Sequence, residues 1–132
     1  MPQLQCIVVT PEATVRDTPA EFVALTLFDG EIGIAAGHTP LIGRLGCGEM
    51  RITQDEKTDR YYVEGGFVEV AGNVVSVLTS RAAPADSLDE AVAREQLTAA
   101  QSKPAHTPEL MAIRDRAVTA GRAQLHVARR AK

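Results

Sequence analysis

The segment from Asp29 to Ile52, DGEIGIAAGHTPLIGRLGCGEMRI, constrains the fold more than any other part of the chain. Glycines and a proline separate its short apolar stretches, a pattern that favours tight turns and short strands. Ile32 and Ile34 alternate with other residues, as in a strand with one buried face. The segment offers no nucleophile with a base and no metal-binding spacing, so it predicts a docking surface.

The rest of the chain to about residue 78 has the same pattern of short strands and turns. Further strands are expected at residues 3–9, 22–27, 50–52, 61–64, 67–70 and 74–79. Turns are expected at Asp29-Gly30, at residues 54–60, at Gly65-Gly66 as a bulge or tight bend, and at residues 71–73. Many short strands at this spacing predict an all-β sandwich or flattened barrel.

The composition changes after the last of these strands. Ser87 and Glu90 match a capping box at the start of a helix, and Thr107 followed by Pro108 matches a second helix start. Residues 102–107 interrupt the helical pattern, so two helices joined by a short turn are expected. The predicted organisation is a β-sandwich domain at 1–83, a linker at 84–87 and a two-helix domain at 88–132.

The apolar stripe of the second predicted helix is narrow. It consists of Leu110, Ile113, Ala117 and Leu125. Gly121 lies within this helix, at a cost of about 1 kcal/mol relative to alanine. We therefore expect a helical hairpin that is held weakly and can change conformation. The alternative is a static hairpin in which Gly121 allows the two helices to approach closely.

Charge is divided unevenly along the chain. Residues 1–87 carry 6 basic and 12 acidic residues, a net charge of −6, whereas residues 88–132 carry 8 and 5, a net charge of +3. The basic tail either meets an acidic partner or is a solvated face. Because the tail has no aromatic residue for base stacking, a nucleic-acid partner is not expected.

The remaining composition also narrows the function. Cys6 and Cys47 are far apart and form no CxxC pair, so reduced thiols are expected in place of a disulfide or a zinc site. No apolar run reaches the roughly 18 residues that cross a bilayer. The first residues lack the basic and apolar regions of a secretory signal, so the chain is expected to stay in the compartment where it is made.

The histidines and the glycine-rich stretch lack the neighbouring residues that catalysis, metal binding or phosphate binding would need. His38 has no nameable nucleophile or carboxylate beside it, and His106 and His126 have no metal-ligand spacing. The glycines at 43, 46 and 48 lack the lysine and the helix of a phosphate-binding loop. The sequence therefore predicts neither an enzyme nor a metal site.

Three motifs together resemble the epsilon subunit family of F-type ATP synthases. They are residues 8–12, VVTPE; residues 29–41, with DGEIGI and GHTPL; and residues 65–78, with GGFVEV, Asn73 and VL. In that family a β-sandwich precedes two helices, which is the order expected here. The resemblance implies a non-catalytic rotor subunit at the cytoplasmic face of the inner (plasma) membrane. It would couple proton flow to ATP synthesis and restrain ATP hydrolysis, without entering the membrane itself.

The resemblance also assigns residues to three surfaces. Those that would face the gamma subunit are Thr10, His38, Ile42 and Gly43. Those that would face the ring of c subunits are Asp29, Gly30 and Glu31. The inhibitory tail would meet the alpha and beta subunits through Arg114, Arg116, Arg122, Arg129 and Arg130.

Some bacterial members of the family bind ATP through a Leu/Ile-Asp-x-x-Arg-Ala motif at the start of the first tail helix. This chain keeps Asp89 but has Val92 in place of the arginine. Arg94 lies about 200° further around the helix and cannot simply replace it. Ala120 and Gln124 occupy the places of ATP-contacting arginines in the second helix. The resemblance therefore implies weak or no ATP binding and no other cofactor.

The residues alone leave a rival interpretation open, a free-standing ligand-binding sandwich whose hairpin closes over a small molecule as a mobile lid. The rival predicts a stable monomer whose melting temperature depends on a ligand. The adaptor interpretation predicts an exposed apolar patch near His38 and co-purification with a large ATPase.

Overall fold

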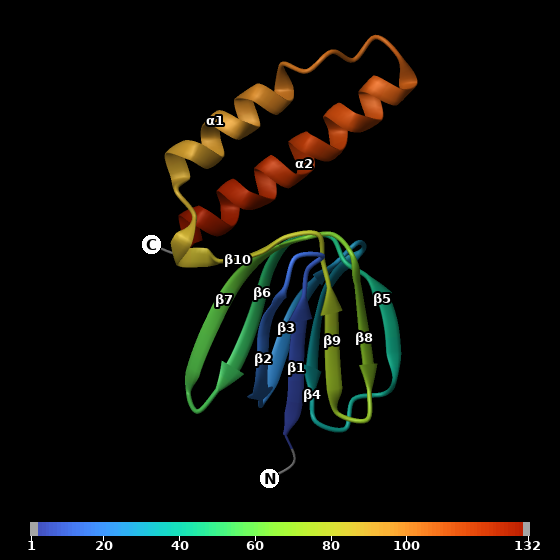
Figure 1. Cartoon of the computed structure of the whole chain (residues 1–132), viewed down its shortest axis with the longest axis vertical. Coiled ribbons are helices and arrows are strands. Elements are labelled where there is room, and N and C mark those ends of the chain that lie inside the picture. Colours follow the sequence, from blue (N-terminus) through green and yellow to red (C-terminus); the bar gives the residue numbers. More distant parts are fainter. Residues whose placement is uncertain (1–2, 131–132) are drawn as a thin grey trace.

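The computed structural model describes residues 3–130 and shows a β-sandwich followed by a two-helix hairpin (Figure 1), as the sequence predicts. The outermost residues of the predicted domains, 1–2 and 131–132, lie outside this range. The strands are β1 Leu4–Val9, β2 Thr14–Ala20, β3 Phe22–Leu27, β4 Gly30–Ala35, β5 Leu41–Arg44, β6 Cys47–Gln54, β7 Lys57–Glu64, β8 Phe67–Ala71, β9 Val74–Leu78 and β10 Ala82–Pro84. The helices are a 3₁₀ turn η1 Ala85–Ser87, α1 Glu90–Gln101 and α2 Pro108–Arg130.

The sandwich consists of two five-stranded sheets. Sheet A has the order β2-β1-β9-β8-β5, and sheet B has the order β10-β7-β6-β3-β4. β1 and β9 pair in parallel, and the other strand pairs within residues 3–130 are antiparallel. The alternating apolar residues meet between the sheets, and this core includes Leu4, Val8, Val23, Leu25, Ile34, Met50, Ile52, Val63, Val68, Val70, Val75 and Val77.

The bend between β7 and β8 confirms the turn predicted at Gly65-Gly66. Both glycines have positive φ, at 67° and 104°. A Cβ atom on Gly66 would overlap the backbone carbonyl group of Leu78. Glycine is therefore required at position 66 both for its φ and for the close approach of another strand.

Two predicted turns need correction by a few residues. The turn between β3 and β4 consists of Phe28 and Asp29, because Leu27 already pairs with Gly30. The charged turn expected at 54–60 is only two residues long, since Asp55 and Glu56 both have positive φ and β7 begins at the next residue. Positive φ at both central residues gives the Asp55-Glu56 turn a backbone twist that matches the twist of the flanking strands.

Three strands lie where none is predicted. β2 contains a proline and charged residues, and β5 contains a glycine, so neither has a strong strand pattern. β10 runs along the edge of sheet B, where Pro84 pairs with Tyr61. The last strand of the sandwich therefore reaches one residue into the predicted linker.

The capping box predicted at Ser87 and Glu90 is wrong. The Ser87 hydroxyl donates to the carbonyl oxygen of Pro84 (2.6 Å), and the carboxylate of Asp89 accepts the backbone N–H groups of Ala91 and Val92. Leu88 stays extended and buried, which places the helix start two residues later than Ser87 would. At α2 the prediction is confirmed, because Thr107 Oγ1 accepts the N–H of Leu110.

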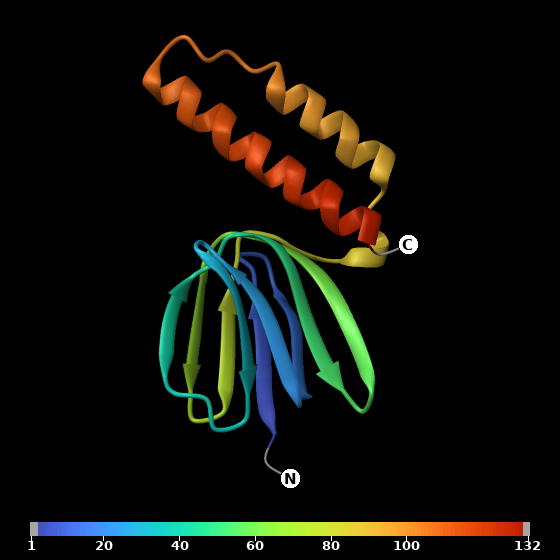
Figure 2. The same cartoon turned by 180° about the vertical axis from the view of Figure 1, so that it is seen from behind.

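The two helices pack closely where Gly121 lies. A Cβ atom there would come within 3.2 Å of the Cα atom of Leu97, so the glycine allows a close approach. The C-terminal half of α2 lies against β6 and β7 on the outer face of sheet B. Ile113, in the other half, is 45% exposed and belongs to no buried stripe. Figure 2 shows the hairpin inclined, with its connecting turn farthest from the sandwich.

Candidate docking surfaces

The outer face of sheet A carries an apolar surface, which we call the outer patch, consisting of Ile42, Phe67 and Leu78. Their exposed fractions are 75%, 58% and 53%. Phe67 pairs with Leu78 on β9 and with Arg44 on β5, two residues after Ile42, so all three side chains lie on one face. Large apolar side chains grouped on a surface are typical of a protein–protein contact.

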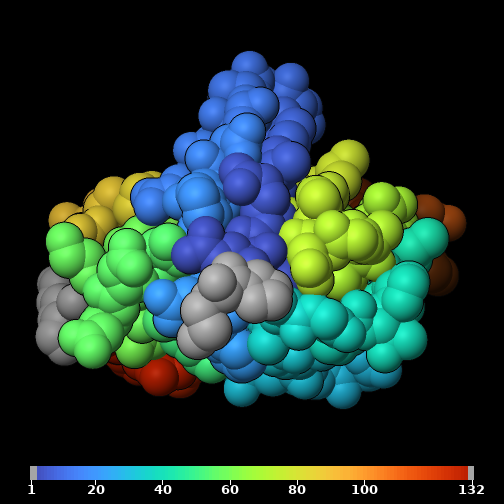
Figure 3. All heavy atoms as spheres, turned by 90° about the horizontal axis from the view of Figure 1, so that it is seen from below, coloured from blue at the N-terminus to red at the C-terminus, as the bar shows by residue number. Residues whose placement is uncertain are grey.

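The loop containing His38 lies at the end of the sandwich opposite the hairpin, where the chain around residues 36–40 adjoins the β8–β9 turn (Figure 3). The two loops are tied by a hydrogen bond from the Gly37 N–H to Asn73 Oδ1 (2.8 Å). His38 is half-buried, and its Nδ1 lies 2.7 Å from the carbonyl oxygen of Thr39. The outer patch starts in β5, which follows this loop, and extends away from it.

The turn containing Asp29 lies at the other end of the sandwich, beside the hairpin. Phe28 in this turn stacks under Arg44, whose guanidinium carbon is 4.7 Å from the ring centroid. Thr10 directly follows β1, which runs toward the same end (Figure 1). Thr10 and His38 therefore do not lie together, and the roles assigned to both by the resemblance stay predictions.

A second surface lies on the outer face of sheet B, where α2 docks. Tyr62 is fully buried there, in a cluster with Ala85, Leu88, Val127 and Ala128. Its hydroxyl lies 2.8 Å from Glu64 Oε1 and 3.2 Å from the carbonyl oxygen of Ala120. Burial and the Glu64 carboxylate raise the pKa of Tyr62 well above its usual range. The phenol therefore stays neutral under the hairpin.

A buried carboxylate lies beside this cluster. The Glu49 side chain is 5% exposed and lies 2.9 Å from Arg51 Nη1, 2.8 Å from Arg60 Nη1 and 3.7 Å from Nη1 of Arg130, at the end of α2. Its Oε2 is buried and has no hydrogen-bond partner within residues 3–130. Glu31, on β4, extends the network to Arg51 at 3.5 Å.

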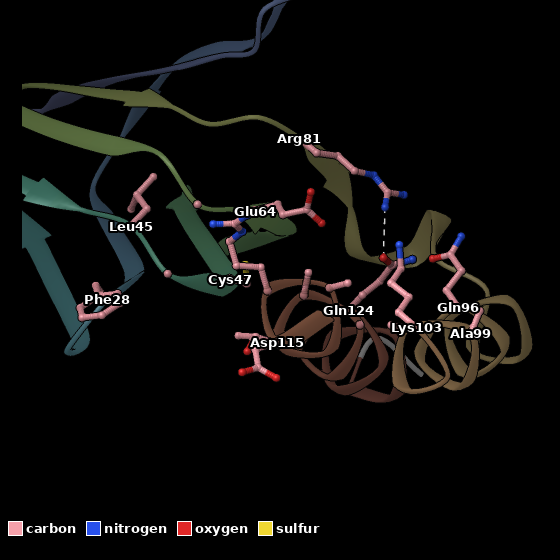
Figure 4. A pocket seen from close by; sticks show the side chains of 18 of the residues that line it. Phe28, Leu45, Cys47, Glu64, Arg81, Gln96, Ala99, Lys103, Asp115 and Gln124 are labelled. Carbon is pink, nitrogen blue, oxygen red and sulfur yellow. Dashed lines mark hydrogen bonds between the residues drawn. The ribbon is translucent and has the colours of Figure 1, made fainter. Parts of the chain in front are cut away.

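A cavity of about 800 Å³ separates the other half of the hairpin from the sandwich (Figure 4). Cys47 and Glu64 line it from the sandwich, and Lys103 lines it from the hairpin. Arg81 Nη1 donates to Oε1 of Gln124 across the interface (3.1 Å) and lies 5.7 Å from the Tyr62 ring centroid. The rival interpretation expects a space of this kind under a lid.

The cysteines are free thiols. Burial raises the pKa of Cys6 to about 12, and burial together with the Glu64 carboxylate raises the pKa of Cys47. Neither thiol is therefore activated as a nucleophile. Among residues 3–130 no group of three His, Cys, Asp or Glu side chains could hold a metal ion. None of the helices in this range is long and apolar enough to cross a membrane.

The five arginines predicted for the inhibitory tail have different surroundings. Arg114 pairs with Asp115, Arg129 pairs with Glu90 of α1 and Arg130 with Glu49 of the sandwich. Arg116 lines the cavity and Arg122 is exposed. Of the two residues considered for ATP, Asp89 caps α1 and Arg94 pairs with Glu90 one turn earlier.

Sequence reasoning missed the residues that dock the hairpin: Glu49, Tyr62, Arg81 and Gln124. One signal was present, because Tyr62 is a large aromatic residue at an outward-facing position between Arg60 and Glu64 of β7. Such a residue on an otherwise charged strand face indicates that something covers it.

Comparisons with known proteins agree with this architecture. Residues 3–85 match the model of a family described as ATP synthase, Delta/Epsilon chain, beta-sandwich domain. The ATP synthase epsilon chain of Rhodopirellula baltica is 48% identical over 126 residues, which cover 96% of this chain and 98% of that one. The epsilon chain of Symbiobacterium thermophilum is 38% identical, covering 78% and 75%.

Solved structures share the fold. A chain of the Euglena gracilis mitochondrial ATP synthase, in a structure of OSCP, F1 and the c-ring, has a TM-score of 0.82 at 22% identity, covering 92% of this chain and 78% of that one. A chain of the central stalk and c-ring of the Tetrahymena thermophila mitochondrial ATP synthase has a TM-score of 0.67 at 12% identity, covering 96% and 97%.

Proposed function

Because the chain belongs to the family of ATP synthase epsilon chains, we propose that it is a non-catalytic subunit of the central stalk. In this role it couples proton flow to ATP synthesis and restrains ATP hydrolysis through its hairpin. It acts at the cytoplasmic face of the inner (plasma) membrane, where its partners hold it. Family membership supports this function over that of a free-standing ligand-binding sandwich.

The outer patch carries the proposal. Three large apolar side chains on one sheet face favour a permanent partner that covers them, since their burial contributes about 25 cal/mol per Å². In the proposed assembly this partner is the gamma subunit, which contacts Ile42 and Gly43 of β5. The predicted gamma contacts at Thr10 and His38 lie near the two ends of the same sandwich.

Replacing Ile42 with glutamate is expected to weaken binding to the stalk by about thirtyfold, the effect of an interface residue worth about 2 kcal/mol. The measurement is the affinity of the variant for the cognate ATPase depleted of this subunit. Thr58→Glu is the matched control, because it adds the same charge to an exposed strand position of sheet B. Equal affinity of the Ile42 variant and the unmodified chain would contradict the assignment of the outer patch.

Two further contacts belong to the proposal. The c-subunit ring faces Asp29 of the β3–β4 turn and Gly30 and Glu31 at the start of β4, which together offer two exposed carboxylates at one end of the sandwich. The alpha and beta subunits meet the arginines of α2. In the docked hairpin Arg129 and Arg130 are already paired within the chain, so this contact requires them to exchange partners. Both arginines are about half exposed, and Arg51 and Arg60 still neutralise the buried Glu49 when Arg130 leaves, so such an exchange costs little.

We further propose that the isolated chain binds ATP weakly or not at all. Val92 presents no charge on α1, and Gln124 is buried with its amide oxygen on Arg81. The carbonyl of Ala120 lies against the Tyr62 hydroxyl. Isothermal calorimetry with ATP is expected to show no micromolar binding. The positive control is a family member that carries the Leu/Ile-Asp-x-x-Arg-Ala motif, and a micromolar Kd for this chain would contradict the expectation.

A further inference from the structure

Within residues 3–130, the hairpin contacts the sandwich mainly near one end. The C-terminal half of α2 contacts β6, β7 and η1, and α1 starts directly after η1. The other end of the hairpin, with the connection at 102–107, stands away from the sandwich in both views (Figures 1 and 2). The cavity occupies part of the space between them. A small number of contacts near the end of α2 therefore decides whether the hairpin is docked or released.

The first of these contacts is a polar bridge across the interface. Gln124 is 6% exposed, and its amide oxygen accepts a hydrogen bond from Arg81 (3.1 Å). A buried amide oxygen without a partner destabilises the structure that buries it, so the docked state depends on Arg81. Release lets water solvate both groups.

The second contact is the ion pair between Arg130 and Glu49, at 3.7 Å. Arg51 and Arg60 are closer to the same carboxylate, so Glu49 is already neutralised when Arg130 arrives. Its Oε2 remains buried without a hydrogen bond. Docking therefore gains a moderate attraction between Arg130 and Glu49, but it also removes water from Oε2 without replacing the lost hydrogen bond. When α2 leaves, water can reach that oxygen again.

We propose that these two contacts, Arg81 with Gln124 and Glu49 with Arg130, form a latch that sets the fraction of chains whose hairpin is released. The apolar cluster around Tyr62 favours docking but is small, since alanines supply two of its members. The latch adds to this attraction, and its residues can be replaced while every member of the apolar cluster is kept. It is a property of the chain alone. Its effect on ATP hydrolysis rests on the proposed function.

The chain contains its own reporter of release. Cys47 lines the cavity next to the docked hairpin, whereas Cys6 is fully buried with a pKa of about 12. A bulky maleimide, too large for the cavity, is therefore expected to modify Cys47 only, and faster when the hairpin is released. The modification rate, followed by mass spectrometry of the whole chain, measures the released fraction.

The test compares Gln124→Ala, Arg130→Gln and their combination with the unmodified chain. Each single change is expected to raise the rate about two- to tenfold, the range that a lost net hydrogen bond gives, and the double change to raise it further. Arg129→Gln is the matched control. It neutralises an arginine of the same helical turn that pairs with Glu90 inside the hairpin, and its rate is expected to stay near that of the unmodified chain.

The substituted residues lie on α2, so the sandwich keeps its core and its melting temperature verifies that each variant is folded. A double variant that reacts no faster than the Arg129 variant would overturn the latch. The same variants are then added to the depleted ATPase. Faster modification without stronger restraint of hydrolysis would support the latch and contradict the proposed inhibitory role of the hairpin.

Discussion

A chain carrying Gly66→Ala is expected to lose about 3 kcal/mol or more of its free energy of unfolding, a large part of the 5–15 kcal/mol typical of a domain. The new Cβ would overlap the carbonyl group of Leu78, which belongs to the backbone of β9 and cannot rotate away. The φ of 104° is also outside the range that alanine adopts without strain. Urea unfolding followed by far-ultraviolet circular dichroism measures the loss.

Gly72→Ala is the control for this prediction. Gly72 also has positive φ, at 55°, but no atom within 4 Å of the added Cβ. It lies in a two-residue turn at the far end of the sandwich. Its replacement is expected to lower the free energy of unfolding by about 1–2 kcal/mol, the cost of placing a residue with a side chain in the left-handed conformation. If both variants lose the same stability, the close approach of β9 to Gly66 is not what requires glycine.

A chain that ends at Ser87 is expected to bind the depleted ATPase and to leave ATP hydrolysis at the rate of the depleted enzyme, whereas the full chain lowers that rate. The outer patch lies entirely on the sandwich and survives the truncation, while all five tail arginines are removed. The measurement is the steady-state rate of ATP hydrolysis after each form is added back. Truncation uncovers Tyr62, so the shortened chain is expected to melt at a lower temperature.

Adding Ile42→Glu to the truncated chain provides the control, because this form should neither bind nor affect the rate. If the full and the truncated chain both bind and both leave hydrolysis unchanged, the hairpin is not inhibitory and the subunit only couples. If neither binds, the assignment to the stalk fails. The two outcomes separate the role of the sandwich from the role of the hairpin.

The sandwich was largely predictable, because its burial is local in the sequence. β1, β8 and β9 alternate buried and more exposed residues, and the apolar and β-branched residues that mark them as strands are visible without a structure. β5 was missed because Gly43 has no side chain to show the pattern, although Leu27 packs against its backbone. Strand propensity depends on such neighbours, which the local sequence does not contain.

The docking of the hairpin was not predictable in the same way. Glu49 is charged, and a charged residue in a strand is normally expected to be exposed to solvent. In the structure it is buried, with Arg130 of α2 beside its carboxylate. Gln124 is likewise buried, and its hydrogen-bond partner Arg81 is far away in the chain. The family resemblance implies a two-helix tail with a set of arginines, but only the contacts within the chain show that Arg129 pairs with Glu90 and Arg130 with Glu49.

The parallel pairing of β1 with β9 also sets an order for biosynthesis. Val9 pairs with Leu78, so β1 stays without a neighbour on that side until β9 has been made. Domains tend to fold as units during synthesis, in order from the N-terminus. The sandwich can therefore close only after residue 78 has emerged, and α2 is made later still. The helix α2 therefore docks on a sandwich whose strands have all been synthesised, and the folding of the sandwich does not depend on the presence of α2.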